Sequence, residues 1–421
     1  MFYGKRRLAG MVSKNEESSA ILSEQHLSSA AFKDEAYEFY KELRVSRPLY
    51  PVSLGDLGEG CLMTRYDDAI RLLKDAKLKK NYENVFTEEE ENRPILSENE
   101  EALTKHMLNS DPPDHSRLRT LVQKAFTPRM ILQLEDRIQH IADSLLDEVY
   151  PTHSMNLLDD FAFPLPIIVI SEMLGIPLED RQNFRVWSEA IIEFPDTPES
   201  MEENNQKIGE FAKYLEYLVH KKRDEPAEDL ISALIEAESE GTTLSTEELY
   251  STIMLLIVAG HETTVNLIAN MTYALLSHPD QLEKLLRNPG LMDSAIEEAL
   301  RFHSPVELTT LRWAAEPFTL HGQEIKRKDV IIISLASANR DEQVFQNAEM
   351  FDIARKNNRH IAFGHGSHFC LGAPLARLEA KIGISTLLRR CPNLQINGER
   401  EQIKWKGNFL MRALEELPLR F

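Results

Sequence analysis

Apolar residues recur at helical spacing along most of the chain from about residue 30 onward. Strand-like alternation is confined to residues 50–63, residues 318–335 and the last dozen residues. Spacings of three and four residues are typical of amphipathic helices, whereas alternation is typical of strands. The pattern therefore predicts a mainly α fold with small β-sheets, of the α+β class.

The clearest single element is a helix that begins at Ser245. Ser245 and Glu248 have the spacing of a capping box, and apolar residues continue to Leu276, where His278 and Pro279 end the pattern. Roughly 32 residues at 1.5 Å each span nearly 50 Å, the width of a whole domain. A helix so apolar in its middle is expected to cross the core.

No linker, repeat or low-complexity tract divides the chain, so residues 30–421 are predicted to form one domain preceded by a flexible tail at residues 1–29. The tail has basic residues but no hydrophobic run behind them, which is unlike a signal peptide. Residues 81–110 and 336–371 lack clean periodicity. Loops that long in a compact domain are usually functional.

Composition narrows the classes of partner. The chain of 421 residues has 48 basic and 68 acidic residues, a net charge of −20, which disfavours nucleic acid or an anionic membrane surface as the main partner. The most apolar stretches are far shorter than the roughly 20 residues of a membrane span. Cys61, Cys370 and Cys391 are too few and too scattered for a disulfide framework, which favours a cytoplasmic protein.

Polar residues interrupt the long apolar helix at residues 259–264, Ala-Gly-His-Glu-Thr-Thr. Buried polar groups need partners or a purpose. One interpretation is structural, with the threonines bonded to carbonyls one turn earlier and Glu262 paired with a basic neighbour. A zinc-protease helix would need a second histidine where Val265 stands, so that interpretation fails.

A second cluster, residues 363–372, reads Phe-Gly-His-Gly-Ser-His-Phe-Cys-Leu-Gly and precedes a helix-like stretch at 373–388. Cys370 thus stands just before a helix N-terminus, where amide N–H groups stabilise a thiolate and favour metal ligation. The three glycines allow tight bends and close approach. A zinc site would use His365, His368 and Cys370, but no matching second pair lies nearby. A lone cysteine is otherwise most often inert packing.

Two further pairs share a helix face. Glu298 and Arg301 are three residues apart, and His115 and Arg119 are four apart after Pro112-Pro113. The second pair suits an anion such as a carboxylate. Taken alone, either would be interpreted as an ordinary solvent-exposed pair.

In this order the motifs resemble the cytochrome P450 haem-thiolate monooxygenases of the soluble bacterial class, from about residue 35 to Phe421. The signature Phe-x-x-Gly-x-x-x-Cys-x-Gly is complete as Phe363, Gly366, Cys370 and Gly372. The resemblance implies the P450 fold, with haem b (iron protoporphyrin IX) between the long central helix and the helix after the cysteine.

The resemblance also implies roles for individual residues. The Cys370 thiolate would be the axial iron ligand, with Phe363 and Gly364 beside it. Anion-binding side chains would hold the haem propionates: His115, Arg119, Arg312 and His368. Glu298 and Arg301 would pair with Arg355 and lock the segment that leads to the cysteine, a structural role.

By the same likeness, Glu262 and Thr263 would form the catalytic acid–alcohol pair that relays protons for oxygen activation. Many members of the family have Asp where this chain has Glu262, and the same role is expected. A threonine at this point also argues against the peroxide-using branch of the family, whose members have Arg-Pro at this position.

Positions carried over to a substrate pocket are apolar, so an apolar substrate is expected, although each could equally be a core position: Leu255, Val258, Ala259, Leu308 and Leu410. Glu307 is expected to face solvent, the alternative being contact with a substrate hydroxyl or amine. Loop 81–110 and the helices around 180–222 would form a lid.

The chain has no flavin or nicotinamide fingerprint. Electrons would therefore come from separate partners. The family likeness implies a ferredoxin and its NAD(P)H-dependent reductase, with Arg117, Arg359 and Arg377 as docking candidates. We expect a monomer that hydroxylates or epoxidises a mid-sized hydrophobic molecule: a polyketide, terpenoid, steroid or fatty acid. The alternatives are C–C cleavage or phenol coupling, or a non-catalytic haem or ligand-binding protein.

Overall fold

The computed structural model describes residues 21–87, 90, 101, 103–192, 197–239 and 244–421, and most of these are helical. The helices are α2 (Glu24–Ser28), α3 (Ala30–Ser46), α4 (Tyr66–Leu72), α6 (Asp114–Ala125), α7 (Pro128–Gln133), α8 (Glu135–Val149), α9 (Pro164–Leu174), α10 (Arg181–Ile192), α11 (Pro198–Asp224), α12 (Leu230–Ser239), α13 (Thr246–Ser277), α14 (Pro279–Arg287), α15 (Met292–Phe302), α16 (Leu335–Ala338) and α17 (Ala373–Arg390).

The strands form three small sheets. They are β1 (Leu22–Ser23), β2 (Leu49–Ser53), β3 (Glu59–Met63), β4 (Leu78–Lys79), β5 (Ser154–Asn156), β6 (Arg312–Ala314), β7 (Phe318–Leu320), β8 (Gln323–Ile325), β9 (Val330–Ile333), β10 (Gln395–Ile396) and β11 (Pro418–Arg420). The largest sheet has the order β1-β2-β3-β9-β6-β4, and the others are β10-β11-β5 and β7-β8.

The register of the large sheet fixes where Arg312 lies. β3 runs parallel to β9 with Cys61 opposite Ile331, and β6 runs antiparallel to β9 with Arg312 opposite Ile331. All four residues of β9 are buried, as expected for a central strand covered on both faces. The sheet thereby holds Arg312 at the beginning of β6 against a rigid, buried strand.

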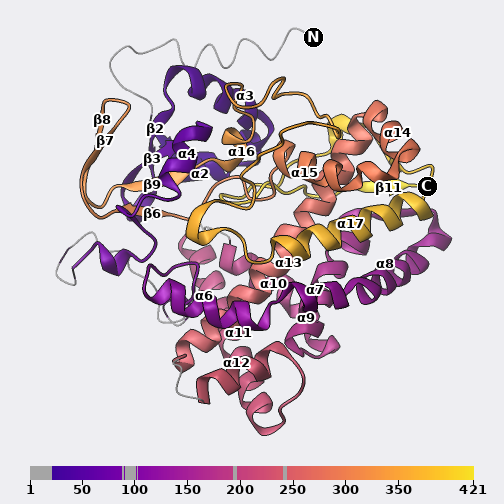
Figure 1. The fold of residues 1–421 in the computed structure, drawn as a ribbon, viewed down its shortest axis with the longest axis horizontal. Coiled ribbons are helices and arrows are strands. Elements are labelled where there is room, and N and C mark those ends of the chain that lie inside the picture. The colour runs from indigo at the N-terminus through magenta and orange to yellow at the C-terminus, as the bar shows by residue number, and fades with distance from the viewer. Residues whose placement is uncertain (1–20, 88–89, 91–100, 102, 193–196, 240–243) are drawn as a thin grey trace.

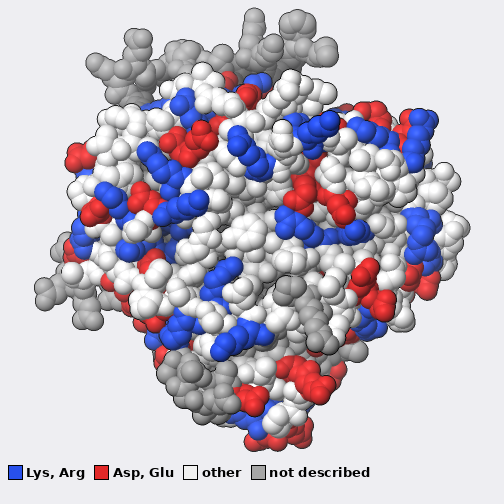
Figure 2. Space-filling view, viewed as in Figure 1, with Lys and Arg blue, Asp and Glu red and all other residues white. Residues whose placement is uncertain are grey.

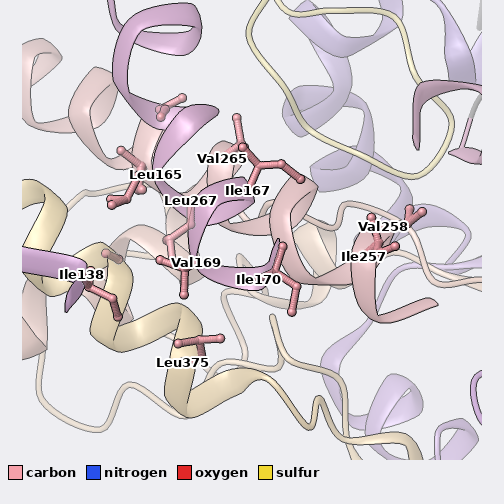
Figure 3. Close-up of a cluster of buried hydrophobic side chains, with 14 of the residues drawn as sticks. Ile138, Leu165, Ile167, Val169, Ile170, Ile257, Val258, Val265, Leu267 and Leu375 are labelled. Carbon is pink, nitrogen blue, oxygen red and sulfur yellow. The ribbon is translucent and has the colours of Figure 1, made fainter. Parts of the chain in front are cut away.

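Helix α13 runs through the middle of the helical part of the molecule (Figure 1). Apolar side chains of α9, α13 and α17 gather in one buried cluster; Figure 3 labels Leu165 and Ile170 of α9, Ile257 and Val265 of α13, and Leu375 of α17. Burial of this apolar surface is the main force that holds the three helices together.

The predicted capping box at the start of α13 is confirmed in both directions. Glu248 N–H donates to the Ser245 hydroxyl, and the Glu248 carboxylate accepts from Ser245 N–H at 2.9 Å. Within the described part of the chain, α13 is the one helix long and apolar enough to cross a membrane, but 78% of its most apolar window is buried inside the protein. It is therefore a core helix, as the sequence predicts.

The predicted boundary of the N-terminal tail is wrong by several residues. Strand β1 pairs with β2, with Leu22 opposite Val52, and α2 follows with Leu27 completely buried. The Ser23 hydroxyl caps α2 by accepting from His26 N–H. Strand pairing, a cap and a buried leucine thus hold residues 22–28 in the domain. The first 20 residues of the predicted tail lie outside the described residues.

Candidate functional site

The loop before α17 folds back on itself. Cys370 N–H donates to the Phe363 carbonyl at 2.9 Å, which closes the loop. Gly364 and Gly366 have φ of +72° and +78°, and a Cβ on Gly366 would lie 3.1 Å from the Leu73 carbonyl oxygen. These two glycines are therefore required. The expectation that Gly372 allows a third tight bend is wrong. Its φ is −79°, a value open to any residue, and it stands at the N-cap of α17.

The Cys370 sulfur sits at the N-terminal end of α17, as predicted. Burial raises the pKa of its thiol, and this effect outweighs the backbone N–H groups of Gly372 and Ala373 and the charges of Arg119 and Arg377, which lower it. The helix end therefore does not produce a free thiolate unaided. Coordination to a metal deprotonates a thiol outright, so these donors suit a sulfur ligand that a metal ion has already ionised.

Four cationic or imidazole side chains predicted to bind carboxylates meet beside this loop. The His115 and His368 rings lie 4.2 Å apart. Burial, followed by the charges of His115, Lys80, Arg312 and Arg119, lowers the pKa of His368 to about 2. The structure thus brings these residues together, although they come from α6, β6 and the loop that carries Cys370; their role toward haem propionates stays a prediction.

The same cluster contains a lysine that the sequence analysis missed. Lys80 follows β4, is 4% exposed, and donates to the Thr310 hydroxyl and, at 2.9 Å, to the Leu311 carbonyl. Burial lowers its pKa well below the usual range, and the charge of Arg312 lowers it further. Lys79-Lys80 reads as an ordinary polar pair at a strand end, so no local signal marks it.

The polar atoms of this cluster fit an anionic group. Both ring nitrogens of His115 and the Nε of Arg312 are buried, and none of the three has a hydrogen-bond partner among the described residues. Burial lowers the pKa of His115, Lys80 and Arg312, and the charge of Asp111 opposes that lowering in all three. The oxygens of Asp111 accept from the backbone N–H groups of Lys80 and Asn81. Buried donors with so little counter-charge suit a ligand that brings its own carboxylates, as haem does.

A zinc site receives no support. Among the residues that the structure describes, no group of three or more His, Cys, Asp or Glu side chains is arranged to hold a metal ion. The cysteine loop therefore offers one sulfur ligand and a set of anion-binding groups, which match haem rather than zinc.

The polar segment of α13 is an opening in an otherwise buried helix. Ala259 is exposed and Gly260, Glu262 and Thr263 are partly exposed, whereas His261 is completely buried. The Thr263 hydroxyl donates to the Ala259 carbonyl at 3.0 Å, so part of the structural interpretation is confirmed. Gly260 has a packing reason as well, because a Cβ there would lie 3.0 Å from Ile170 Cγ1.

Glu262 is surrounded by cations. Burial favours its neutral form, but the nearby His261 imidazole and the charges of Lys406 and Arg185 outweigh burial and lower the pKa of Glu262. His261 Nε2 lies 3.2 Å from Glu262 Oε1. The carboxylate is therefore ionised at neutral pH. It belongs to the residue directly before Thr263.

The expected ion-pair network behind the cysteine loop is confirmed. Arg301 donates to both oxygens of Glu298 at 2.8 Å, and Arg355 Nε lies 3.0 Å from Glu298 Oε2. The remaining guanidinium N–H groups of Arg301 and Arg355 bind backbone carbonyls between Asn339 and Met350. This network fixes the segment that leads into the cysteine loop.

The positions carried over to a substrate pocket do not all have the same environment. Leu255 and Val258 are 7% and 6% exposed, Ala259 is exposed and Leu410 is partly buried, whereas Leu308 is completely buried. Leu308 packs in a cluster with Val52 and Phe409, and Leu410 lies against that cluster. Four of the five thus retain some exposed surface, and Leu308 is a core residue in this structure.

The expectation that Glu307 faces solvent is wrong. Glu307 is completely buried; it lies 3.1 Å from the Lys33 ammonium and accepts from the Tyr40 hydroxyl at 2.7 Å. Arg412 adds a second cation at 3.4 Å. Its partners stand more than 100 residues away in the sequence, which is why the local pattern gave no sign of them.

Two of the three docking candidates are engaged elsewhere. Arg117 forms a two-pronged ion pair with Glu248, and Arg377 does the same with Glu297 while stacking 4.5 Å over the Phe363 ring. Arg359 is exposed. The charges of Arg117 and Arg377 are thus largely neutralised, which weakens them as contacts for an acidic partner.

Comparison with known proteins adds independent findings. A family model described as "Cytochrome P450" matches residues 73–416. A protein of Bacillus subtilis (strain 168) described as "Cytochrome P450" is 78% identical over 411 residues, covering 98% of this chain and 100% of that protein. The polyketide biosynthesis cytochrome P450 PksS of the same organism is 44% identical over 392 residues, covering 92% of this chain and 96% of PksS.

Solved structures agree. A myxobacterial cytochrome P450, determined in complex with myristic acid, superposes with a TM-score of 0.90 at 42% identity, covering 94% of this chain and 98% of that chain. The similarity thus includes the cysteine loop, the long helix and the paired Glu298 and Arg301, all within the matched residues.

Proposed function

This chain belongs to the cytochrome P450 family, and from that premise we propose that it hydroxylates or epoxidises a mid-sized hydrophobic molecule with O2 and two electrons from a separate ferredoxin and reductase. Its fold is the P450 fold, and it is an oxidoreductase of the monooxygenase type. We further propose that it works as a cytoplasmic monomer, in line with its net charge of −20 and three cysteines.

The cation cluster beside the cysteine loop carries the proposal. His115, Arg119, Arg312 and His368 would hold the two haem propionates, and Lys80 would add a fifth donor. Charge-assisted bonds to carboxylates are about twice as strong as neutral ones. Cys370 would hold the haem iron through its sulfur, with Phe363, itself covered by Arg377, limiting access of water. Bound haem would supply the electron-transfer and oxygen chemistry.

The residues of the opened helix would manage protons. Glu262 is ionised and 14% exposed, so it can exchange protons with solvent. Thr263 Oγ1 is held by the Ala259 carbonyl one turn earlier. A carboxylate followed by a fixed hydroxyl gives a short relay from the protein exterior toward the face of the helix that is open at Ala259.

The proposed substrate is apolar at the reacting carbon. Leu255 and Val258 are buried and Ala259 is exposed on α13; these three uncharged residues would form the wall of the pocket. Apolar walls with few polar groups are typical of small-molecule sites. The similarity to a polyketide biosynthesis enzyme and to a protein solved with myristic acid supports a polyketide or a fatty acid as the first substrates to test.

The face that carries the cysteine loop is the proposed docking surface for ferredoxin. Phe369, next to Cys370, is 41% exposed, Arg359 is exposed, and exposed Lys74 lies beside Gly366. Figure 2 looks onto the side on which α17 and this loop lie, and shows Lys and Arg side chains on either side of a mainly uncharged area. Such a surface suits an acidic partner despite the overall negative charge.

The first experiment is the absorption spectrum of the purified protein, reduced with dithionite and exposed to carbon monoxide. Thiolate ligation of haem iron moves the main band of the carbon monoxide complex strongly to the red. We expect that band in the wild type and in Cys61→Ala, and its loss in Cys370→Ala. Haem without the red-shifted band, or no haem after reconstitution, would refute the proposal.

The second experiment identifies the reaction. Fatty acids and polyketides are screened by the change in haem spin state, and the products are weighed. An added mass of one oxygen atom is expected. Fragments, or a loss of two hydrogens, would instead indicate C–C cleavage or phenol coupling. Ligand binding with neither product nor electron consumption would favour a non-catalytic binding protein.

A further inference from the structure

We propose that His261 and Glu262 hold one proton between them, and that His261 is a positioning residue that stores this proton for Glu262. The inference rests on the relay role of Glu262 proposed above. It goes further, because His261 is a buried side chain to which that role assigns nothing. Only one ring nitrogen of His261 is free to change its protonation.

The Nδ1 atom of His261 is committed. It lies 2.7 Å from the carbonyl oxygen of Ile257, one turn earlier in α13. A carbonyl oxygen only accepts hydrogen bonds, so Nδ1 must carry a hydrogen. Every change of protonation on this ring therefore takes place at Nε2.

The Nε2 atom faces Glu262. His261 is completely buried, Nε2 has no aligned hydrogen-bond partner, and Glu262 Oε1 lies 3.2 Å away. With a neutral ring and an ionised carboxylate, two lone pairs would meet in a dry environment, which is unfavourable. One shared proton turns this contact into an ion pair or a neutral hydrogen bond.

The surroundings disfavour a second proton and offer His261 no other outlet. The Phe163 ring meets His261 edge-on at 5.6 Å, and the apolar cluster of Figure 3 includes Ile257 in the same turn. The charged and titratable groups nearby are Arg185 and Glu189 of α10, Asp159 before α9, Lys406 of the C-terminal segment and, beyond Thr264, Glu379 of α17. Arg185 and Lys406 both act on Glu262 and favour its ionised form.

The proton movement balances without any oxidant. Transfer breaks the N–H bond at His261 Nε2 and forms an O–H bond at Glu262 Oε1, so an ion pair becomes a neutral pair. Nδ1 keeps its hydrogen and its bond to the Ile257 carbonyl throughout. Since Nε2 is buried and Glu262 is partly exposed, the proton enters and leaves His261 only through Glu262.

The direct test locates the proton without relying on turnover. In the ferrous carbon monoxide form at pH 7, nitrogen-15 NMR reports whether Nε2 is protonated, and infrared spectroscopy reports a protonated Glu262 carboxyl. His261→Asn and Glu262→Gln identify the two signals. The expected result is one proton on the pair. A neutral ring beside an ionised carboxylate, or protonation of both groups, would overturn the inference.

Two matched variants test the store in turnover with myristic acid as the probe substrate. His261→Asn keeps an amide for the Ile257 carbonyl, and His261→Gln keeps an uncharged donor toward Glu262, but neither side chain titrates. In both variants, we expect the fraction of electrons recovered in product to fall about tenfold relative to wild type at pH 8 and to change little at pH 6. A tenfold fall is what results when the alkaline part of a pH profile moves by one pH unit. Wild-type profiles, or a defect confined to His261→Asn, would overturn the inference.

Failure of this inference is distinguishable from failure of the proposed relay. If Thr263→Ala couples electrons to product as the wild type does, the relay itself is refuted. If Thr263→Ala is uncoupled while both His261 variants behave as wild type over the whole pH range, the relay stands and the proton store is refuted.

Discussion

The Lys33 ammonium and the Glu307 carboxylate lie 3.1 Å apart, and neither side chain has any exposed surface. Tyr40 and Arg412 complete the shell of Glu307. Together these contacts hold helix α3 against the segment between α15 and β6. Charges buried to this extent stabilise only as a set, because each one left alone would be an uncompensated charge.

Glu307→Gln is therefore expected to destabilise the protein strongly. Loss of the carboxylate leaves Lys33 and Arg412 buried without their counter-charge, which costs about 3 to 5 kcal/mol. Urea unfolding of the haem-loaded protein measures the loss. Glu283→Gln, which removes an exposed pair with Arg287, is the matched control and should change the midpoint little. Similar midpoints for both variants would contradict the account.

Arg312→Met is expected to have opposite effects on the two forms of the protein. It removes a buried cation whose pKa is lowered to about 10 by burial and which has no ion-pair partner in contact among the described residues. Loss of a charge-assisted bond of about 1.5 to 3 kcal/mol should speed haem transfer to an acceptor protein by roughly tenfold or more. The haem-free protein should become more stable, because one repulsive charge is gone. A destabilised haem-free variant would contradict this.

Thr263→Ala is expected to separate electron use from product formation. Its hydroxyl stands next to Glu262 in the opened part of α13, so electrons should be lost to peroxide while haem and substrate binding persist. Oxygen consumption, peroxide and product are measured together. Thr272→Ala is the matched control, since Thr272 makes the same bond to a carbonyl one turn earlier, within the core. Equal coupling in both variants would contradict the relay.

Glu379→Gln is expected to change how stability depends on pH. Burial raises the pKa of Glu379 to about 8, opposed only in part by Thr264. Below about pH 4.5 the carboxyl is protonated in both folded and unfolded chains and has no effect. As pH rises towards 8 the unfolded chain alone ionises, which costs the wild type roughly 3 kcal/mol at pH 7. The stability advantage of Glu379→Gln should therefore grow from pH 5 to pH 7. An advantage that does not vary with pH would refute the raised pKa.

The elements that were predictable from sequence are those with local signals. The capping box of Ser245 and Glu248 located α13, and the glycines around Cys370 located the loop before α17. The Glu298 and Arg301 pair was predicted because both residues stand on one turn of α15. In each case the determining residues lie within a few positions of one another.

The features that were missed depend on distant contacts. Lys80 joins the cation cluster only because β4 pairs with β6, which carries Arg312. Glu307 is buried because α3, far away in the sequence, brings Lys33 and Tyr40 to it. The pairing of Leu22 with Val52 likewise ties down a segment that reads as a tail. Local pattern carries no information about such tertiary partners.

The cation cluster has a consequence for the life of the protein in the cell. Mutual repulsion among the Lys80, Arg312 and Arg119 cations opposes folding of this region until an anionic ligand neutralises them. A ligand that binds only the folded protein then raises the free energy of unfolding by mass action. Newly made chains without haem would open more often and be degraded sooner. The same charges that select the cofactor therefore couple the lifetime of the polypeptide to the supply of haem.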